Sequence, residues 1–159
     1  MKKAGAVLAF ALAVSTLFAS GQMQHLRREE TVAKLNLSAS ELKQVIAGVE
    51  AAAFDFPDSW EKELVARRVS LGAAPGLVLQ GTNLLCGGTG NCQIFVFRKV
   101  GQDWVPLFAG EEAPVVEGFG FGPEATRGIK DLHVQAISSA DKSASGTYQF
   151  DGKFYRAAK

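Results

Sequence analysis

Residues 77–100, LVLQGTNLLCGGTGNCQIFVFRKV, contain two apolar runs on either side of a glycine-rich loop that is flanked by Cys86 and Cys92. Two runs rich in Val, Ile, Leu and Phe around a cluster of turn residues are typical of a β-hairpin. The loop, GGTGN over residues 87–91, consists mostly of residues that tolerate positive φ, so the chain can reverse there and bring both cysteines together. We therefore expect two paired strands closed by a Cys86–Cys92 disulfide.

The first residues predict export. Lys2 and Lys3 precede an apolar run over residues 4–19, after which small residues follow. This order is typical of a cleaved secretory signal peptide, and the run is too short for a typical membrane-spanning helix. We expect cleavage of residues 1–21, no membrane span in the chain that remains, and a periplasmic or secreted protein. A retained N-terminal anchor is the alternative.

Composition argues against strongly charged partners. The whole chain has 17 basic and 16 acidic residues, and residues 1–21 hold two of the basic ones and no acidic one. The mature chain therefore has 15 basic against 16 acidic residues, a net charge of −1, which indicates no nucleic-acid partner and no strong attraction to an anionic membrane. About 138 residues remain, which suits one domain with its own hydrophobic core.

The two cysteines favour a structural disulfide over metal or redox chemistry. An exported chain with one pair of cysteines is expected to oxidise them. Their C-x5-C spacing differs from the C-x-x-C of zinc-ribbon and thioredoxin-like sites, and no second pair is present. We predict no metal site and no cofactor.

An amphipathic helix is predicted after a polar segment. Residues 22–36 are mixed in charge and have little periodicity, so we expect a flexible lead-in before a single globular domain over residues 37–159. Ser38 and Glu41 have the spacing of a capping box, in which each side chain satisfies a backbone N–H of the first turn. Apolar residues then recur at intervals of three and four up to about residue 53, the pattern of a helix with one apolar face.

From residue 64 onward the pattern changes to short strands. We count about seven, and the last two form a hairpin around the turn dipeptide Asp151-Gly152. In residues 92–100 both alternating faces are apolar, which predicts a central strand covered on both sides, and Pro106 places its own strand at an edge. Three glycines over residues 118–122 predict a poor strand, and residues 138–146 a polar turn. The predicted fold class is α+β, with one N-terminal helix packed on a mainly antiparallel sheet.

The sequence contains no complete catalytic constellation. The two histidines lie far apart, no G-x-S-x-G or H-E-x-x-H motif occurs, and a strand follows the glycine-rich loop where a P-loop needs a helix. We therefore nominate no catalytic residue. The carboxylates that a glycoside hydrolase would need are limited to neighbouring or near-neighbouring pairs, Glu111 with Glu112 and Asp55 with Asp58.

Two other features have two interpretations each. Phe119 and Phe121, flanked by glycines, either offer apolar area to a partner or plug one end of the core. The dipeptides Arg67-Arg68 and Arg98-Lys99 are either charges that protect strand edges or, if their strands are neighbours, a small basic patch.

Three sequence blocks resemble a pattern in small exported bacterial proteins of uncharacterised function. The blocks are C-G-G-T-G-N-C followed by F-V-F-R (residues 86–98), T-R-G-I-K-D-L (126–132) and Y-Q-F-D-G-K-F-Y (148–155). The resemblance spans residues 64–157. It implies a periplasmic or secreted β-rich domain with a disulfide hairpin and implies no known reaction.

A second similarity is to periplasmic lysozyme inhibitors, which insert an S-G-x-x-Y-like loop and a T-K-G-like loop into the enzyme cleft. The nearest matches are residues 145–148, SGTY, and residues 126–128, TRG. The first is one residue shorter than the inhibitor motif, the order of the two blocks is reversed, and Arg127 stands in place of Lys.

These observations predict an exported, non-enzymatic domain that binds a protein or an envelope component through loops at one end of its sheet. A periplasmic lysozyme or hydrolase inhibitor and a glycan-active hydrolase are the alternatives. The sequence indicates neither the ligand nor the oligomeric state. The candidate binding residues are Phe119, Phe121, Thr126, Arg127, Ser145 and Tyr148.

Overall fold

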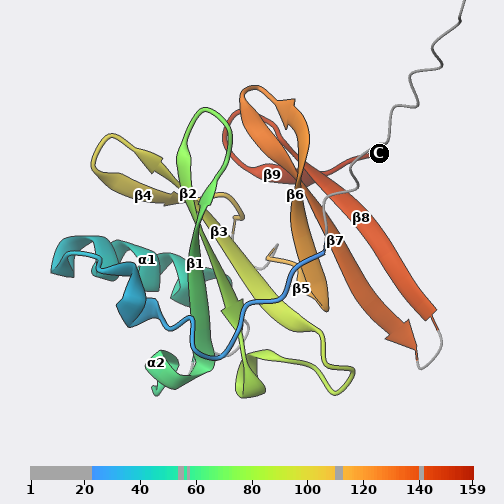
Figure 1. Ribbon diagram of the computed structural model, residues 1–159, viewed down its shortest axis with the longest axis horizontal. Helices are drawn as coiled ribbons and strands as arrows, with labels where there is room; N and C mark the ends of the chain where they lie inside the picture. The colour runs from blue at the N-terminus through green and yellow to red at the C-terminus, as the bar shows by residue number, and fades with distance from the viewer. Residues whose placement is uncertain (1–22, 54–55, 57, 110–112, 140–141) are drawn as a thin grey trace, which may run out of the picture.

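Two antiparallel β-sheets form most of the computed structural model, which describes residues 23–53, 56, 58–109, 113–139 and 142–159 (Figure 1). The first sheet has the order β1-β2-β3-β4, with β5 also paired to β3, and the second has the order β6-β7-β8-β9. The strands are β1 (Leu64–Ser70), β2 (Pro75–Gly81), β3 (Cys92–Val100), β4 (Asp103–Pro106), β5 (Val115–Val116), β6 (Gly118–Thr126), β7 (Ile129–Ser139), β8 (Lys142–Phe150) and β9 (Tyr155–Ala157).

The β-rich antiparallel fold and the disulfide are confirmed. The count of about seven strands in one sheet is not, because the described residues form nine strands in two sheets. Residues 1–21, the expected signal peptide, lie outside the described residues. No helix among the residues that the structure describes is both long and apolar enough to cross a membrane.

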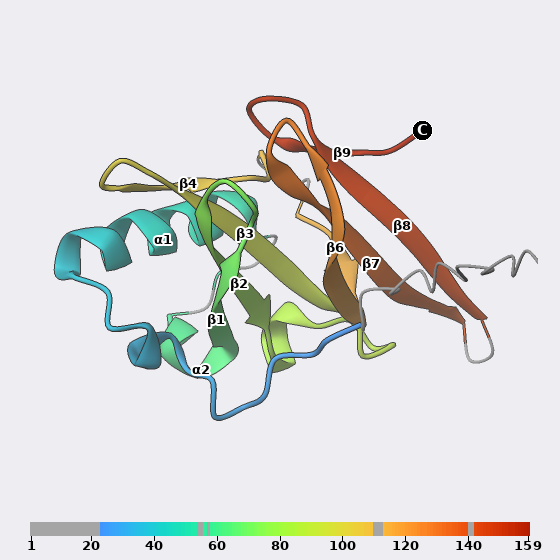
Figure 2. The same ribbon diagram turned by 45° about the horizontal axis from the view of Figure 1, so that its top comes forward.

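Helix α1 (Ala39–Ala52) lies against one face of the first sheet (Figures 1 and 2). At its N-terminus Ser38 Oγ accepts from the backbone N–H of Glu41 at 3.2 Å, and Glu41 Oε2 accepts from the N–H of Ser38 at 2.9 Å. These are the two bonds of the capping box. Gly48 allows the close approach, since a Cβ there would lie 2.6 Å from the ring of Phe97.

Strand β3 is apolar on both faces because both faces are covered. Phe97 faces α1, whereas the guanidinium carbon of the next residue, Arg98, lies 4.8 Å from the ring centroid of Phe150 in the second sheet. Helix α1 and the second sheet therefore sandwich the first sheet, and β4, which contains Pro106, lies at its edge. The chain leaves the first sheet after β5 and enters the second at β6. At this crossing the backbone N–H of Glu117 donates to Gln135 O at 2.8 Å.

Residues 23–31 connect the two sheets along one side of the molecule (Figure 1). Gln24 exchanges two backbone hydrogen bonds with Phe119 of β6, of 2.7 and 3.1 Å, and Glu30 O accepts from Ala66 of β1 at 2.6 Å. The following 3-10 helix η1 (Val32–Leu35) buries Val32 and Leu35 in the core. The sequence patterns predict a flexible lead-in over residues 22–36, whereas these contacts tie the described part of that segment to both sheets.

Two sequence predictions differ in detail from the structure. Residues 118–126 form strand β6 despite three glycines. At one of them, Gly122, the absence of a Cβ leaves room for neighbouring side chains, since a Cβ there would clash with Glu124 Oε2 and lie 2.5 Å from His133 Nε2. A register shift between Phe121 and Ala125 interrupts the pairing with β7. The chain does reverse within the predicted polar turn over residues 138–146, because β7 ends at Ser139 and pairs there with Lys142, the first residue of β8. The turn is shorter than predicted, since the rest of that stretch is the exposed N-terminal half of β8.

Candidate functional site

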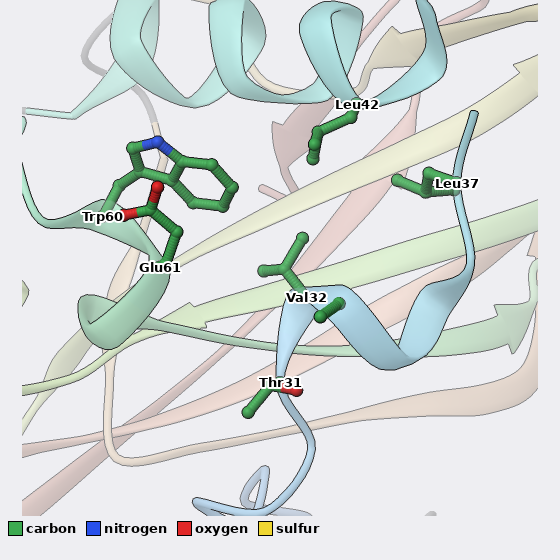
Figure 3. Close-up of a pocket in the computed structure, with 7 residues that line it drawn as sticks. Thr31, Val32, Leu37, Leu42, Trp60 and Glu61 are labelled. Carbon is green, nitrogen blue, oxygen red and sulfur yellow. The ribbon is translucent and has the colours of Figure 1, made fainter. Parts of the chain in front are cut away.

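An apolar pocket of about 310 Å³ opens between η1, the start of α1 and the short helix α2 (Trp60–Glu63) (Figure 3). Figure 3 shows the side chains of Val32, Leu37, Leu42 and Trp60 pointing toward one another across it. The residues that line the pocket are Thr31, Val32, Ala33, Leu37, Leu42, Trp60 and Glu61.

Local structure explains how these side chains come together. Leu37 precedes the N-cap Ser38 and Leu42 occupies the fourth helical position, the spacing of a hydrophobic staple. Val32 is anchored in the core at 4% exposure, while Trp60 is half-buried and packs against that core. One side of the pocket is therefore formed by a core residue, Val32, and another by the aromatic ring of Trp60.

The chemistry of the pocket suits binding more than catalysis. Its polar lining groups are the hydroxyl of Thr31 and the exposed carboxylate of Glu61. General acid–base or nucleophilic catalysis needs at least a nucleophile beside a base, or two facing titratable groups. The lining residues contain neither arrangement.

The disulfide loop reaches the second sheet through one side chain. Cys86 and Cys92 are bonded, as predicted. The side-chain amide of the adjacent Asn91, which is 9% exposed, donates to Ile137 O at 2.7 Å and accepts from Ile137 N–H at 2.8 Å. Asn91 thereby replaces a neighbouring strand at this point of β7. Sequence reasoning placed Asn91 among the turn residues and had no signal for this long-range contact.

Five of the six predicted binding residues lie in strands of the second sheet and not in a loop, and three of these five are aromatic. Phe119 lies in β6 and is 1% exposed. Leu132 of the central strand β7 pairs with Phe121 of β6 on one side and with Tyr148 of β8 on the other. The ring centroids of Phe119 and Phe121 lie 6.2 Å apart, and Tyr148 packs edge-on against Phe108. Of the two interpretations of these phenylalanines, the packing favours the core.

The other three do not form one site. Thr126 donates to the carboxylate of Asp131 at 2.7 Å, and Arg127 follows at the tip of the β6–β7 turn. Ser145 is exposed within β8, paired with Gln135, away from that turn in the register of the sheet. The two segments that match the inhibitor loops are thus a turn and the interior of a strand.

The histidines and carboxylates that were considered as catalytic candidates do not come together in one place. His133 Nδ1 lies 3.0 Å from Thr147 Oγ1, and its Nε2 lies 3.6 Å from Glu124 Oε2. Asp58 is exposed, and Asp55, Glu111 and Glu112 lie outside the described residues. Across the part of the chain that the structure describes, no three His, Cys, Asp or Glu side chains group closely enough to hold a metal ion.

The strands that carry the paired basic residues, β1 and β3, are not neighbours, because β2 lies between them. One residue of each pair nevertheless reaches the ring of Trp104: Arg68 lies 5.9 Å and Lys99 4.7 Å from its centroid. Arg67 pairs with Glu30 at 2.6 Å, and Lys99 pairs with Glu41. Trp104 Nε1 also donates to Glu41, at 3.2 Å. The hydrogen bond from Lys99, followed by that from the Ser38 N–H, lowers the pKa of Glu41 to about 2.

No family model, no curated protein and no solved structure matches this chain.

Proposed function

We propose that this protein is an exported, non-enzymatic binding domain that accepts an apolar group of a protein or envelope component in the pocket beside Trp60. The pocket itself carries the proposal. Its volume of about 310 Å³ lies at the small end of the range for ligand sites, roughly 300–1,000 Å³. Five of its seven lining residues are apolar, so it favours an aliphatic or aromatic group over a polar one.

The positions of the pocket residues support a preformed site. The hydrophobic staple, η1 and α2 each supply lining side chains, and both Val32 and the Leu37–Leu42 pair also contact the core. A binding site whose walls are fixed before the ligand arrives loses less conformational entropy on binding.

Filling the pocket tests the proposal. Ala33 lines it but is exposed, so Ala33→Trp adds bulk without removing a core contact. Ala47→Trp places the same side chain on an exposed position of α1 that does not line the pocket and serves as the matched control. The processed protein is used as bait on an envelope extract. We expect the wild type and Ala47→Trp to capture the same component in equal amounts. Ala33→Trp should capture at least about tenfold less of it, the effect of blocking a central contact residue of an interface.

The tryptophan fluorescence of the protein gives a second measure of binding once the captured component is added back. Trp60 is half-buried and Trp104 is buried, so covering the pocket should shift the emission of Trp60 to shorter wavelength. Trp60→Phe should abolish that shift. Equal capture by the wild type and Ala33→Trp, or a shift that persists in Trp60→Phe, would contradict the proposal.

A further inference from the structure

Three turns meet at the end of the two sheets that lies at the top of Figures 1 and 2. They are the β1–β2 turn, the β6–β7 turn and the β8–β9 turn. Six exposed residues at their tips form a surface that we call the turn platform: Gly72, Ala73, Arg127, Gly128, Gly152 and Lys153.

The first two turns are fixed to each other by backbone contacts. Ala73 N–H donates to Gly128 O at 2.9 Å, and Lys130 N–H donates to Leu71 O at 3.0 Å. Gly72 is in the left-handed region at φ 87°, and a Cβ there would lie 2.7 Å from Gly128 O. The side chain of Arg127 then reaches the third turn, where its Nη1 would lie 3.5 Å from a Cβ on Gly152.

Arg127 is an unusual choice for its position. It has a φ of 54° and precedes Gly128 at φ 81°, in a two-residue turn that joins Thr126 to Ile129. Such turns favour Asn, Asp or Gly at both central positions, because a Cβ with a bulky side chain is strained at positive φ. The other two non-glycine residues with positive φ among the described residues are both asparagines, Asn36 and Asn83. Strain of this kind that persists in a fold is a pointer to function.

Among the residues that the structure describes, neither positive charge of the platform is paired with a carboxylate. Within the described residues no hydrogen bond or ion pair is made by the Arg127 guanidinium, and the ammonium of Lys153 lies over the ring of Phe154 at 5.1 Å. Asp151, the acidic residue of the same turns, is already engaged by the N–H groups of Lys153 and Phe154, both at 2.7 Å, and by Arg156 at 3.2 Å.

The charge of the chain is also distributed unevenly. Residues 126–159 contain six basic and three acidic residues, whereas residues 22–125 contain nine basic and 13 acidic ones. The near-neutral total therefore conceals a basic C-terminal segment, residues 126–159, which includes two of the three turns. A local potential of this kind can attract an anionic partner even when the net charge is close to zero.

We propose that the turn platform docks on an anionic lipid surface, with Arg127 and Lys153 contacting phosphate groups. A small anion would contact one point of the platform, whereas the platform extends over the tips of three turns. A flat surface that carries many phosphates can contact several turn tips at once. The other exposed residues of the platform, its three glycines and Ala73, are small and uncharged, so the backbone can approach that surface closely. This docking does not depend on the pocket beside Trp60.

The test compares sedimentation of the processed protein with vesicles of phosphatidylcholine alone and with vesicles that contain roughly one third phosphatidylglycerol. We expect preferential binding to the anionic vesicles, and loss of that preference at about 1 M salt, where the screening length falls to about 3 Å. Arg127→Asn keeps a residue suited to positive φ and removes the charge, and Lys153→Gln removes the second charge. Each should weaken binding about fivefold, the effect of one basic group near an anionic surface.

Matched variants separate the platform from general charge. Arg28→Asn and Lys43→Gln remove the same charges from exposed positions elsewhere and should bind as the wild type does. Ala33→Trp should also bind normally, which distinguishes this proposal from the pocket. Thermal unfolding checks the fold, and Arg127→Asn is expected to unfold at the same or a higher temperature.

Three outcomes would overturn the proposal. The first is equal binding to both kinds of vesicle. The second is an equal loss of binding in the platform variants and in Arg28→Asn and Lys43→Gln. The third is salt-sensitive binding to soluble polyglutamate without binding to vesicles, which would assign the platform to an acidic protein.

Discussion

Asn91 and Ile137 are far apart in the sequence, yet the side-chain amide of Asn91 satisfies both backbone groups of Ile137. Backbone groups withdrawn from water need such partners, because an unpaired one costs about 1–3 kcal/mol. At this point of β7 the neighbouring strand β6 has already ended, since its pairing stops at Gly118 and Gln135. The side chain of Asn91 therefore makes the two hydrogen bonds that a neighbouring strand would otherwise make with Ile137.

We predict that Asn91→Ala lowers the free energy of unfolding by about 1–3 kcal/mol, because both groups of Ile137 lose their partner. Chemical denaturation measures this, and amide hydrogen exchange at Ile137 should accelerate. Thr89→Ala, which removes a hydroxyl that contacts Asn91 from an exposed position, is the control and should change stability by less than about 0.5 kcal/mol. Equal unfolding free energies for the two variants would show that the amide contributes nothing.

At the scale of elements, the disulfide loop stabilises the fold in two ways. The Cys86–Cys92 bond restricts the unfolded chain, and it also fixes the backbone that presents Asn91 to β7. The backbone hydrogen bond from Gly87 N–H to Asn91 O, at 2.7 Å, lies inside the same loop. The loop thus connects the first sheet, through β3, to the second.

We predict that replacing both cysteines by serine lowers the free energy of unfolding by about 2–2.5 kcal/mol, the loop-entropy value for about seven residues. If the bond also positions Asn91, the effects of this change and of Asn91→Ala should not add. A double-mutant cycle measures that coupling, expected at about 0.5 kcal/mol or more. An unchanged stability under oxidising conditions would contradict the first expectation, and strict additivity the second.

At the scale of the whole molecule, charged side chains join parts that are distant in sequence. Glu41 holds the start of α1 to the β3–β4 hairpin through Lys99 and Trp104, and Glu30 holds the N-terminal segment to β1 through Arg67. The hydrogen bond from Arg67 is the main cause of the lowered pKa of Glu30. Hydrogen bonds from the N–H groups of Phe154 and Lys153 lower the pKa of Asp151 to about 2.

These lowered pKa values predict loss of stability in acid. The pKa of Glu41 falls from an ordinary value of 4.5 to about 2 on folding, so its contribution is complete above pH 4.5 and is lost as the pH falls toward 2. The thermal midpoint should therefore decline over that interval, and less steeply in Glu41→Gln. Glu50→Gln, an exposed glutamate on the same helix, is the charge-matched control. A decline of the same steepness in the wild type and Glu41→Gln would contradict this role.

Sequence patterns were sufficient to predict the features whose interacting groups are close together along the chain. The capping box of Ser38 and Glu41, the disulfide hairpin and the two-sided apolar pattern of β3 all follow from spacing along the chain, because the interacting groups are close in sequence or repeat with a strand's period. The sequence therefore determined by itself the β-rich antiparallel class and the Cys86–Cys92 bond.

Only the tertiary structure decided the rest, because those features depend on groups brought together from distant segments. The sequence offers no reason for a glycine at position 122 of β6, whereas the structure places the ring of His133 where a Cβ would lie. The pocket beside Trp60 combines three separate elements, and the turn platform combines three turns. The net charge of the sequence hides the platform, since a sum over residues carries no information about where in space the charges lie.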